Sequence, residues 1–260
     1  MSDESPAVMR PTRAEVCVVA IAECFRGDGE ILANPIGTIP MIGGRLARAT
    51  FEPDLVMTDG EAALVTNNEA FEFSRKVVEA YNPYRAMFDM VWSGKRHVIM
   101  SGSQIDAFGN HNFAAIGSEW GAPRVQLLGF RGAPGNTIQN ATSYWIPAHS
   151  RQIFVEHVDT VTGVGWDRAD ALGSAGRYFD LRRIVTNLCV MDFGGPSHRL
   201  RLVSVHPGVS LEDVIAATGF ELAVAEPIEV SRTPDANEEF LIREVIDPSG
   251  ARERELPDPA

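Results

Sequence analysis

The chain has 260 residues, 45% hydrophobic and 22% charged, with a formal net charge of −12. We expect one domain over residues 12 to 247, between polar tails at residues 1 to 11 and 248 to 260 that are expected to be mobile. The negative charge opposes nucleic-acid binding, which needs clustered Lys and Arg. No apolar run approaches the roughly 20 residues that span a bilayer, and the start shows no leader, so we expect a cytoplasmic protein without a membrane partner.

Helices and strands are predicted to alternate through the first half of the chain. Residues 12 to 26 carry apolar side chains at helical spacing, and Gly27-Asp28-Gly29 ends that helix. The next predicted elements are a strand over 30 to 33, a loop over 34 to 40, a helix over 41 to 49, a strand over 55 to 57, a helix over 84 to 92 and a strand over 97 to 100.

The second half is predicted to add strands over 125 to 128, 153 to 158, 184 to 191 and 200 to 205. Ser210 with Asp213 forms a capping pair for a helix closed by Gly219, and Thr233-Pro234 opens a last helix with an apolar face of Phe240, Leu241, Val245 and Ile246. Apolar strands of this kind are covered on both faces. They therefore predict an α/β fold with three layers and an open, mostly parallel sheet.

Ligands of open α/β sheets bind in the loops after the carboxyl ends of the strands, and two such loops come first. Gly37 and Thr38 form either an ordinary turn before a helix or a loop that approaches a ligand. Gly102 lets the backbone come close to a ligand, and Gln104 adds a neutral amide that can donate to a thioester oxygen. From its residue type alone, a Gln at the end of a strand is usually a solvated or capping side chain.

The loop over residues 129 to 136 is the third candidate. Gly132 and Gly135 leave room for a bulky ligand, and their N–H groups can form a nest for a phosphate or an oxyanion beside Asn136. The alternative is a surface turn stiffened by Pro134. Arg131 cannot lose its charge, so it recruits a carboxylate if it faces the site and has no such role if it points into solvent.

The other reactive side chains predict no metal site and no separate cofactor. Cys17, Cys24 and Cys189 lack metal-binding spacing and are expected to be structural thiols. The six histidines lie apart from any nucleophile motif or zinc motif, and the first βα crossover has no dinucleotide fingerprint.

Four blocks of sequence, in order, resemble the β subunit of class I coenzyme A transferases, the glutaconate type in particular. They span most of residues 15 to 165, and a weaker match continues to the end of the chain. The blocks are Asn-Pro-Ile-Gly-Thr-Ile-Pro (34 to 40, running into 43 to 47), Pro-Asp-Leu-Val-Met-Thr-Asp-Gly (53 to 60), Gly-Ser-Gln-Ile-Asp (102 to 106, with 109 to 112) and Gly-Phe-Arg-Gly-Ala-Pro-Gly-Asn (129 to 136).

Two departures from the family pattern fall at the reaction centre. Transferases of this family carry a nucleophilic glutamate where this chain has Thr58, and usually glycine where it has Arg131. A threonine hydroxyl without a base does not replace the carboxylate that forms a glutamyl-CoA thioester. Asp59 points to the opposite face of the strand, and Glu61 follows a glycine, so neither is a simple substitute. The two departures resemble a steroid ring-cleaving hydrolase of the same family.

The resemblance implies a β subunit that acts with a homologous α subunit, expected as an α2β2 heterotetramer. The implied reaction opens the last steroid ring by hydrolytic C–C cleavage of a cyclic β-keto acyl-CoA thioester, with the base on the partner. We expect Gln104, Arg131 and Gly132 to donate hydrogen bonds to the negative charge that develops during the reaction. CoA is part of the substrate, and we expect it to contact a second set of residues. That set is Gly37, Thr38, Gly102, Gly132, Gly135 and Asn136. The alternatives are an ordinary transferase that uses Asp59 or Glu61, and a non-catalytic scaffold subunit that binds CoA.

Overall fold

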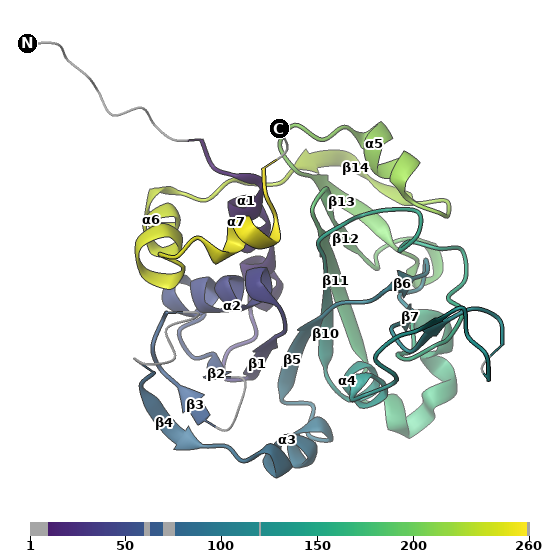
Figure 1. Ribbon diagram of the computed structural model, residues 1–260, viewed down its shortest axis with the longest axis horizontal. Coiled ribbons are helices and arrows are strands. Elements are labelled where there is room, and N and C mark those ends of the chain that lie inside the picture. Colours follow the sequence, from purple (N-terminus) through teal and green to yellow (C-terminus); the bar gives the residue numbers. More distant parts are fainter. Residues whose placement is uncertain (1–9, 60–62, 70–75, 120, 259–260) are drawn as a thin grey trace, which may run out of the picture.

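A ten-stranded sheet runs through the centre of the molecule (Figure 1). The computed structural model describes residues 10 to 59, 63 to 69, 76 to 119 and 121 to 258. The five central strands run parallel, and antiparallel strands extend the sheet on both sides. In sheet order the strands are β14 (Ala223–Val230), β13 (Arg201–Val205), β12 (Cys189–Asp192), β11 (Asp180–Thr186), β10 (Ala141–Ile146), β5 (Arg96–Met100), β1 (Leu32–Pro35), β2 (Val56–Thr58), β3 (Ala63–Val65) and β4 (Val78–Tyr81).

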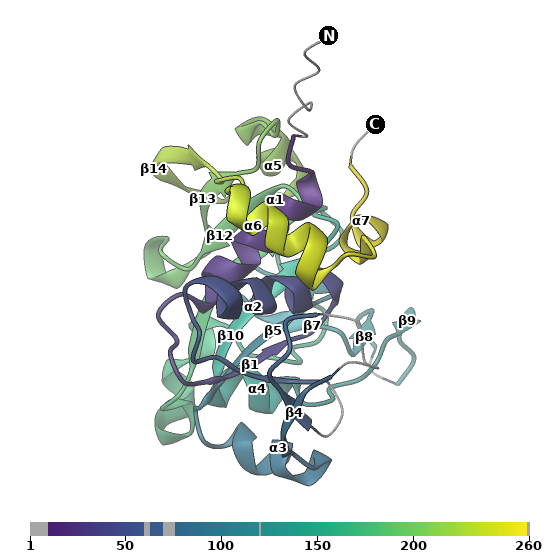
Figure 2. The ribbon, with the colours of Figure 1, turned by 90° about the vertical axis from the view of Figure 1, so that its left-hand side faces the viewer.

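One face of the sheet is covered by a layer of helices, which Figure 2 shows in front of the strands. Alternate residues of the central strands, such as Ile99, Trp145 and Val185, pack into this layer because successive side chains of a strand point to opposite faces. The helices are α1 (Arg13–Ala22), η1 (Glu23–Phe25), α2 (Thr38–Thr50), α6 (Ala236–Phe240), its π-helical continuation η6 (Leu241–Ile246) and α7 (Ala251–Glu255).

The opposite face is covered by shorter elements and loops around a second core, to which the central strands contribute Val98, Tyr144 and Ile184. These elements are α4 (Ala133–Gln139), α5 (Leu211–Ala217), η3 (Trp166–Arg168), η4 (Asp170–Gly176), η5 (Pro196–His198) and the small hairpins β6 (Gln104–Ile105) with β7 (His111–Asn112) and β8 (Ala115–Ile116) with β9 (Val125–Gln126). Helix α3 (Tyr84–Val91) lies near one end of the sheet (Figure 1). The predicted three-layer, mostly parallel α/β fold is confirmed. Within the described ranges, no helix is long and apolar enough to cross a bilayer.

Local sequence signals fix several helix starts. The Thr12 hydroxyl accepts a hydrogen bond from the Glu15 N–H while the Glu15 carboxylate accepts one from the Thr12 N–H, and Ser210 with Asp213 repeats this capping box at α5. The predicted pair at Ser210 is therefore confirmed. The last helix starts later than predicted, at Ala236, because the Asp235 side chain caps it.

Three predicted strands are wrong in detail. Residues 184 to 191 form two antiparallel strands, because the Thr186 hydroxyl accepts hydrogen bonds from the Leu188 and Cys189 N–H groups and turns the chain. Residues 125 to 128 provide only β9, outside the main sheet. Residues 153 to 158 form no strand, and only Phe154 bridges to Ile105. The fully buried strand β10 is not among the predicted elements.

The chain beyond residue 247, expected to be a mobile tail, instead contains α7 and joins the helical layer. Leu256 lies in the core, and the buried Arg252 guanidinium binds Glu15 and Asp247 at 3.2 and 3.0 Å. Glu15, which has no exposed surface, also binds Arg243 at 2.7 Å. Glu15 lies 237 positions from Arg252 and 228 positions from Arg243, so these ion pairs tie the end of the chain to α1, and residues up to Leu256 belong to the folded domain.

Glu15→Gln is expected to reduce the free energy of unfolding by about 3–5 kcal/mol, because it removes the carboxylate that the buried Arg252 and the half-buried Arg243 share. Burial opposes ionisation of Glu15, but hydrogen bonds from Arg243 and Thr12 prevail and lower its pKa. The stabilisation is therefore fully present above the ordinary pKa of 4.5 and is lost as pH falls through the lower folded-state pKa. Denaturant unfolding at several pH values measures this.

The matched control is Glu239→Gln, which removes a longer and partly exposed ion pair with Arg243 at 3.5 Å. It should cost at most about 1 kcal/mol. Equal effects of the two substitutions would show that the buried network does not hold α7 in place.

Candidate active site

The carboxyl ends of the parallel strands bring the predicted loops to one edge of the sheet. Gly37 follows β1, Thr58 ends β2, and Gly102 follows β5. Because these strands are parallel neighbours, their ends lie side by side. The sheet therefore brings the first three sequence blocks together.

Thr58 belongs to a row of residues on the sheet face away from α2. The register pairs Leu32 with Val56 and Ala33 with Met57, so the next pair along β1 and β2 is Asn34 with Thr58. Met57 is buried in the helical layer, which places its neighbour Thr58 on the opposite face. The half-buried Thr58 thus stands beside Asn34 at the site edge.

Asp59 is committed to a structural role. Its carboxylate binds the Lys76 ammonium at 2.7 Å and accepts a hydrogen bond from the Ala63 N–H at 3.0 Å, while its own N–H donates to the Ala63 carbonyl. These contacts close the turn between β2 and β3. A carboxylate held in this way has little freedom to attack a thioester. Glu61, the other alternative nucleophile, lies outside the described residues.

Gln104 is buried, and both ends of its amide are engaged within the chain. Its oxygen accepts from the Asn112 side chain at 2.8 Å and from the Asp159 N–H at 3.0 Å, while its nitrogen donates to the Asp159 carboxylate at 3.3 Å. One amide N–H remains for a ligand. Gly102 is also buried, and a Cβ there would lie 3.2 Å from Ile105, so its glycine is explained by close packing of the β6–β7 hairpin.

The glycines of the third loop have different roles. Gly132 is the N-cap of α4 and is exposed, and a Cβ at this position would have only the Asn136 amide nitrogen nearby, at 3.8 Å. Gly135 instead faces α3, because a Cβ there would lie 2.9 Å from Val91. Close packing against Val91 therefore explains the glycine at position 135, and contact of Gly135 with CoA stays a prediction.

Arg131 is exposed and adopts a left-handed backbone conformation with φ of 51°. Its Nε donates to the Leu128 carbonyl at 3.0 Å, and among the described residues it has no carboxylate partner. Its neighbours Leu128 and Phe130 are 70% and 40% exposed. The loop thus presents a cation flanked by apolar side chains on the surface.

Asn136 is buried, and its oxygen accepts a hydrogen bond from Arg96 at 2.7 Å. Arg96, at the start of β5, was not predicted as a site residue. Its second amide partner is Asn34. The sequence contained one signal, a charged residue that opens an otherwise apolar strand, but its partners lie 40 and 62 positions away.

Gly37 and Thr38 stand at the start of α2. Gly37 is exposed with φ of 120°, a conformation that favours glycine, and Thr38 is half-buried. The N–H of Ile39 already donates to Glu255, whose other oxygen binds the Trp145 indole at 2.7 Å. The chain's own carboxylate therefore occupies part of this helix start, and contact of Gly37 and Thr38 with CoA stays a prediction.

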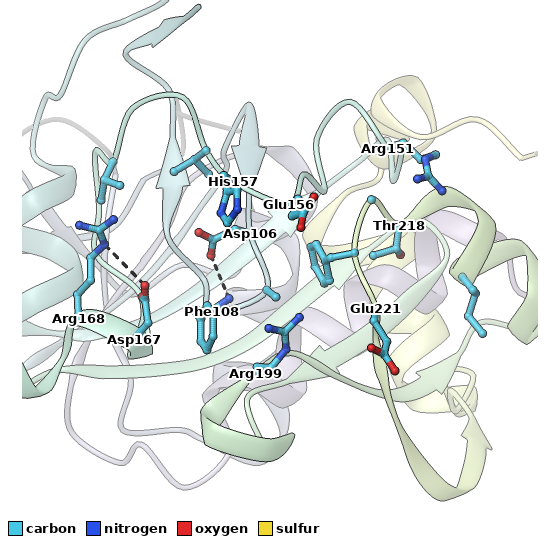
Figure 3. Close-up of a pocket in the computed structure, with 16 residues that line it drawn as sticks. Asp106, Phe108, Arg151, Glu156, His157, Asp167, Arg168, Arg199, Thr218 and Glu221 are labelled. Carbon is cyan, nitrogen blue, oxygen red and sulfur yellow. Dashed lines mark hydrogen bonds and ion pairs between the residues drawn. The ribbon is translucent and has the colours of Figure 1, made fainter. Parts of the chain in front are cut away.

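A polar cavity lies away from the predicted site residues. A cavity of about 690 Å³ lies between the turn at Asp106 and α5, and Figure 3 shows Arg151, Arg199, Glu156 and Glu221 around it. None of the predicted site residues lines this cavity. Within the described ranges, no group of three or more His, Cys, Asp or Glu side chains is arranged to hold a metal ion.

His97 connects Asp28 and Ser143 in the order of a nucleophile triad, with distances of 2.7 and 3.0 Å. Ser143 and His97 have no exposed surface, so a substrate cannot reach them. Burial also lowers the pKa of His149 and of His206 to about 4, which keeps both imidazoles neutral at neutral pH. These groups are structural, as predicted from their scattered positions.

Comparison with known proteins places this geometry in a family. No family model matches the chain. It is 47% identical over 252 residues to the cholesterol ring-cleaving hydrolase IpdB subunit of Rhodococcus jostii, covering 97% of this chain and 99% of the relative. It is 27% identical over 265 residues to the B-type subunit of the glutaconate CoA-transferase of Acidaminococcus fermentans, covering 92% and 94%.

The solved structures agree with these relatives. The Rhodococcus jostii IpdAB structure superposes with a TM-score of 0.92 at 47% identity, over 95% of this chain and 99% of that one. The Acidaminococcus fermentans glutaconate coenzyme A-transferase gives 0.80 at 25% identity, over 92% and 96%. The predicted resemblance is thus confirmed, and the chain belongs to the family of cholesterol ring-cleaving hydrolase IpdB subunits, which share the fold of class I CoA-transferase β subunits.

Proposed function

We infer that this chain is the β subunit of a heteromeric hydrolase of cholesterol degradation that cleaves a steroid ring. The observation that carries this inference is its similarity over nearly the full length to an IpdB subunit, together with the superposition on the IpdAB complex. Thr58, at the end of β2, agrees with hydrolysis because it offers no carboxylate for a covalent transferase intermediate.

We propose a cyclic β-keto acyl-CoA thioester as the substrate, with CoA as part of it and no separate cofactor. A base on the α subunit removes a proton from water, and the hydroxide adds to the ring ketone to give an alkoxide. The alkoxide collapses to a carboxylic acid, which breaks the ring bond to the carbon next to the thioester. The electron pair passes to the thioester enolate, and protonation of that carbon completes the addition of one water.

In this proposal, three residues of this chain supply hydrogen-bond donors to the negative charge on the alkoxide and the enolate. Gly132 exposes backbone at the start of α4, Arg131 offers a cation without a carboxylate partner among the described residues, and Gln104 retains one N–H. Donors that are fixed before the reaction stabilise an oxyanion without reorganisation. We propose that the exposed Gly37 and the half-buried Thr38 contact CoA.

The alternative of a transferase that uses Asp59 loses support from the contacts of its carboxylate with Lys76 and Ala63. A scaffold subunit remains the competing proposal from a different class. It predicts that variants of the Arg131 loop change assembly or CoA binding but leave turnover per complex intact.

The first functional prediction concerns assembly. The purified chain should not turn over substrate alone, because the proposed base lies on the α subunit. Co-expression should give a stable complex, expected as α2β2, that converts the CoA thioester to its ring-opened acid. Size-exclusion chromatography with light scattering and mass spectrometry of the product check both points, and robust turnover by the isolated chain would contradict the shared site.

Arg131→Gly separates the role of the cation from that of the loop, because glycine suits the left-handed conformation of this residue. Turnover should fall by about 100- to 1,000-fold with an unchanged or higher melting temperature. The control Arg124→Ala removes a nearby exposed charge and should leave turnover unchanged.

Gln104→Ala should lower both turnover and thermal stability, because it leaves Asn112 and Asp159 without their hydrogen-bond partner. Full activity of both site variants would refute their roles.

Thr58→Ala is expected to reduce turnover only modestly, by the loss of one hydroxyl contact, as the residue is not the nucleophile. Intact-mass measurement during turnover should find no acyl or CoA adduct on this chain. Detection of a CoA thioester on Asp59 or Glu61 would instead establish the transferase mechanism.

A further inference from the structure

Arg96 is a buried cation whose charge is not neutralised by a neighbouring carboxylate in the described part of the chain. Its side chain is only 6% exposed, yet its guanidinium donates to the neutral amide oxygens of Asn136 and Asn34, and its Nε has no hydrogen bond. Burial lowers the pKa of Arg96 to about 10, so the guanidinium still carries its full charge at neutral pH. Burying a charge without an opposite charge beside it destabilises the folded state, so a functional reason for Arg96 has to be considered.

The guanidinium fixes the orientation of both amides. Arginine only donates hydrogen bonds, so each asparagine must turn its oxygen toward Arg96 and its NH2 group away. The Asn136 nitrogen lies 4.0 Å from the Met100 sulfur, and the position of a Cβ on Gly132 would be 3.8 Å from it. The Asn34 nitrogen makes no hydrogen bond to any described residue. Arg96 therefore holds two amide donors in fixed directions.

These donors belong to the parts of the site where the chain departs from the transferase pattern. Asn34 stands beside Thr58 in the register of β1 and β2. Asn136 follows Arg131 and Gly132 in the same loop and helix. One buried arginine thus ties together β1 and α4, two of the segments that build the candidate site.

We propose that Arg96 is a positioning residue and that Asn34 and Asn136 donate to a substrate oxygen that becomes anionic during ring opening. This rests on the proposed function. The oxygen is either the alkoxide formed when water adds to the ketone or the enolate of the thioester, and both require N–H donors. Neutral partners leave the positive charge of Arg96 free to stabilise that anion through the two amides.

The test replaces each amide by its isosteric acid in the complete α–β complex. Asn34→Asp and Asn136→Asp keep an oxygen for Arg96, remove the N–H donor and add a negative charge that neutralises the guanidinium. Turnover should fall by about 100-fold or more, with KM changed far less than kcat and the melting temperature unchanged or higher. Arg96→Lys, which cannot hold both amides, should also lower kcat.

Asn237→Asp, on the exposed first turn of α6, makes the same chemical change away from the site and should leave kcat unchanged. If an acid variant fails to fold, Asn34→Leu removes the donor without adding charge and decides the question by its kcat. Wild-type kcat in the folded Asn34 and Asn136 variants would overturn the proposal and leave Arg96 a structural residue. A wild-type complex that produces no ring-opened acid would overturn the proposed function, and this assignment with it.

Discussion

The parallel register of β2, β1, β5 and β10 is the constraint on which the candidate site depends. It sets Thr58, Asn34, Val98 and Thr142 in one row across four strands. It also sends the loop after each strand to the same edge of the sheet. A slip of one residue in β2 would turn Thr58 into the helical layer and Met57 toward the site. The burial of Met57 under α2 therefore decides which side chain the reaction centre receives.

The buried carboxylates of the chain differ from the buried Arg96 in how their charges are compensated. Glu15, Asp28 and Asp59 each bind a cationic side chain within 2.7 Å, and the pairs made by Glu15 and Asp28 connect segments that are distant in the sequence. Arg96 differs because its guanidinium donates to two neutral amides and, among the described residues, binds no carboxylate. Arg131 has no carboxylate partner among the described residues either, although it is exposed. Arg96 and Arg131 therefore leave positive charge at the site that no described carboxylate neutralises. This charge can stabilise the anionic intermediates of the proposed reaction.

The pattern of apolar residues was enough to predict the fold class, the helices of the first half and the strands at both sides of the site. It failed at β10, which is buried but contains Thr142 and Ser143, two polar residues that are paired in the interior. It also failed at the charged segment around Arg252, which resembles a solvated tail until Glu15 and Asp247 are placed beside it. Local sequence does not reveal Glu15 as a partner of Arg252, because the two residues are 237 positions apart.

The site was predictable in its loops but not in its contacts. Sequence blocks located Gln104, Arg131 and Gly132, while the commitment of Asp59 to Lys76 and of Gln104 to Asp159 required the three-dimensional structure. Arg96 could not be predicted as a site residue, because its proposed role depends on the absence of a carboxylate around it in the described structure. Such a property belongs to the assembled fold and has no local motif.

Turnover of the complete complex in water labelled with oxygen-18 tests most directly whether the reaction is a hydrolytic carbon–carbon cleavage. We predict one heavy oxygen in the newly formed carboxylate, with the CoA thioester intact. Release of free CoA with the label in the former thioester carboxylate, or CoA transfer without any label, would contradict this mechanism.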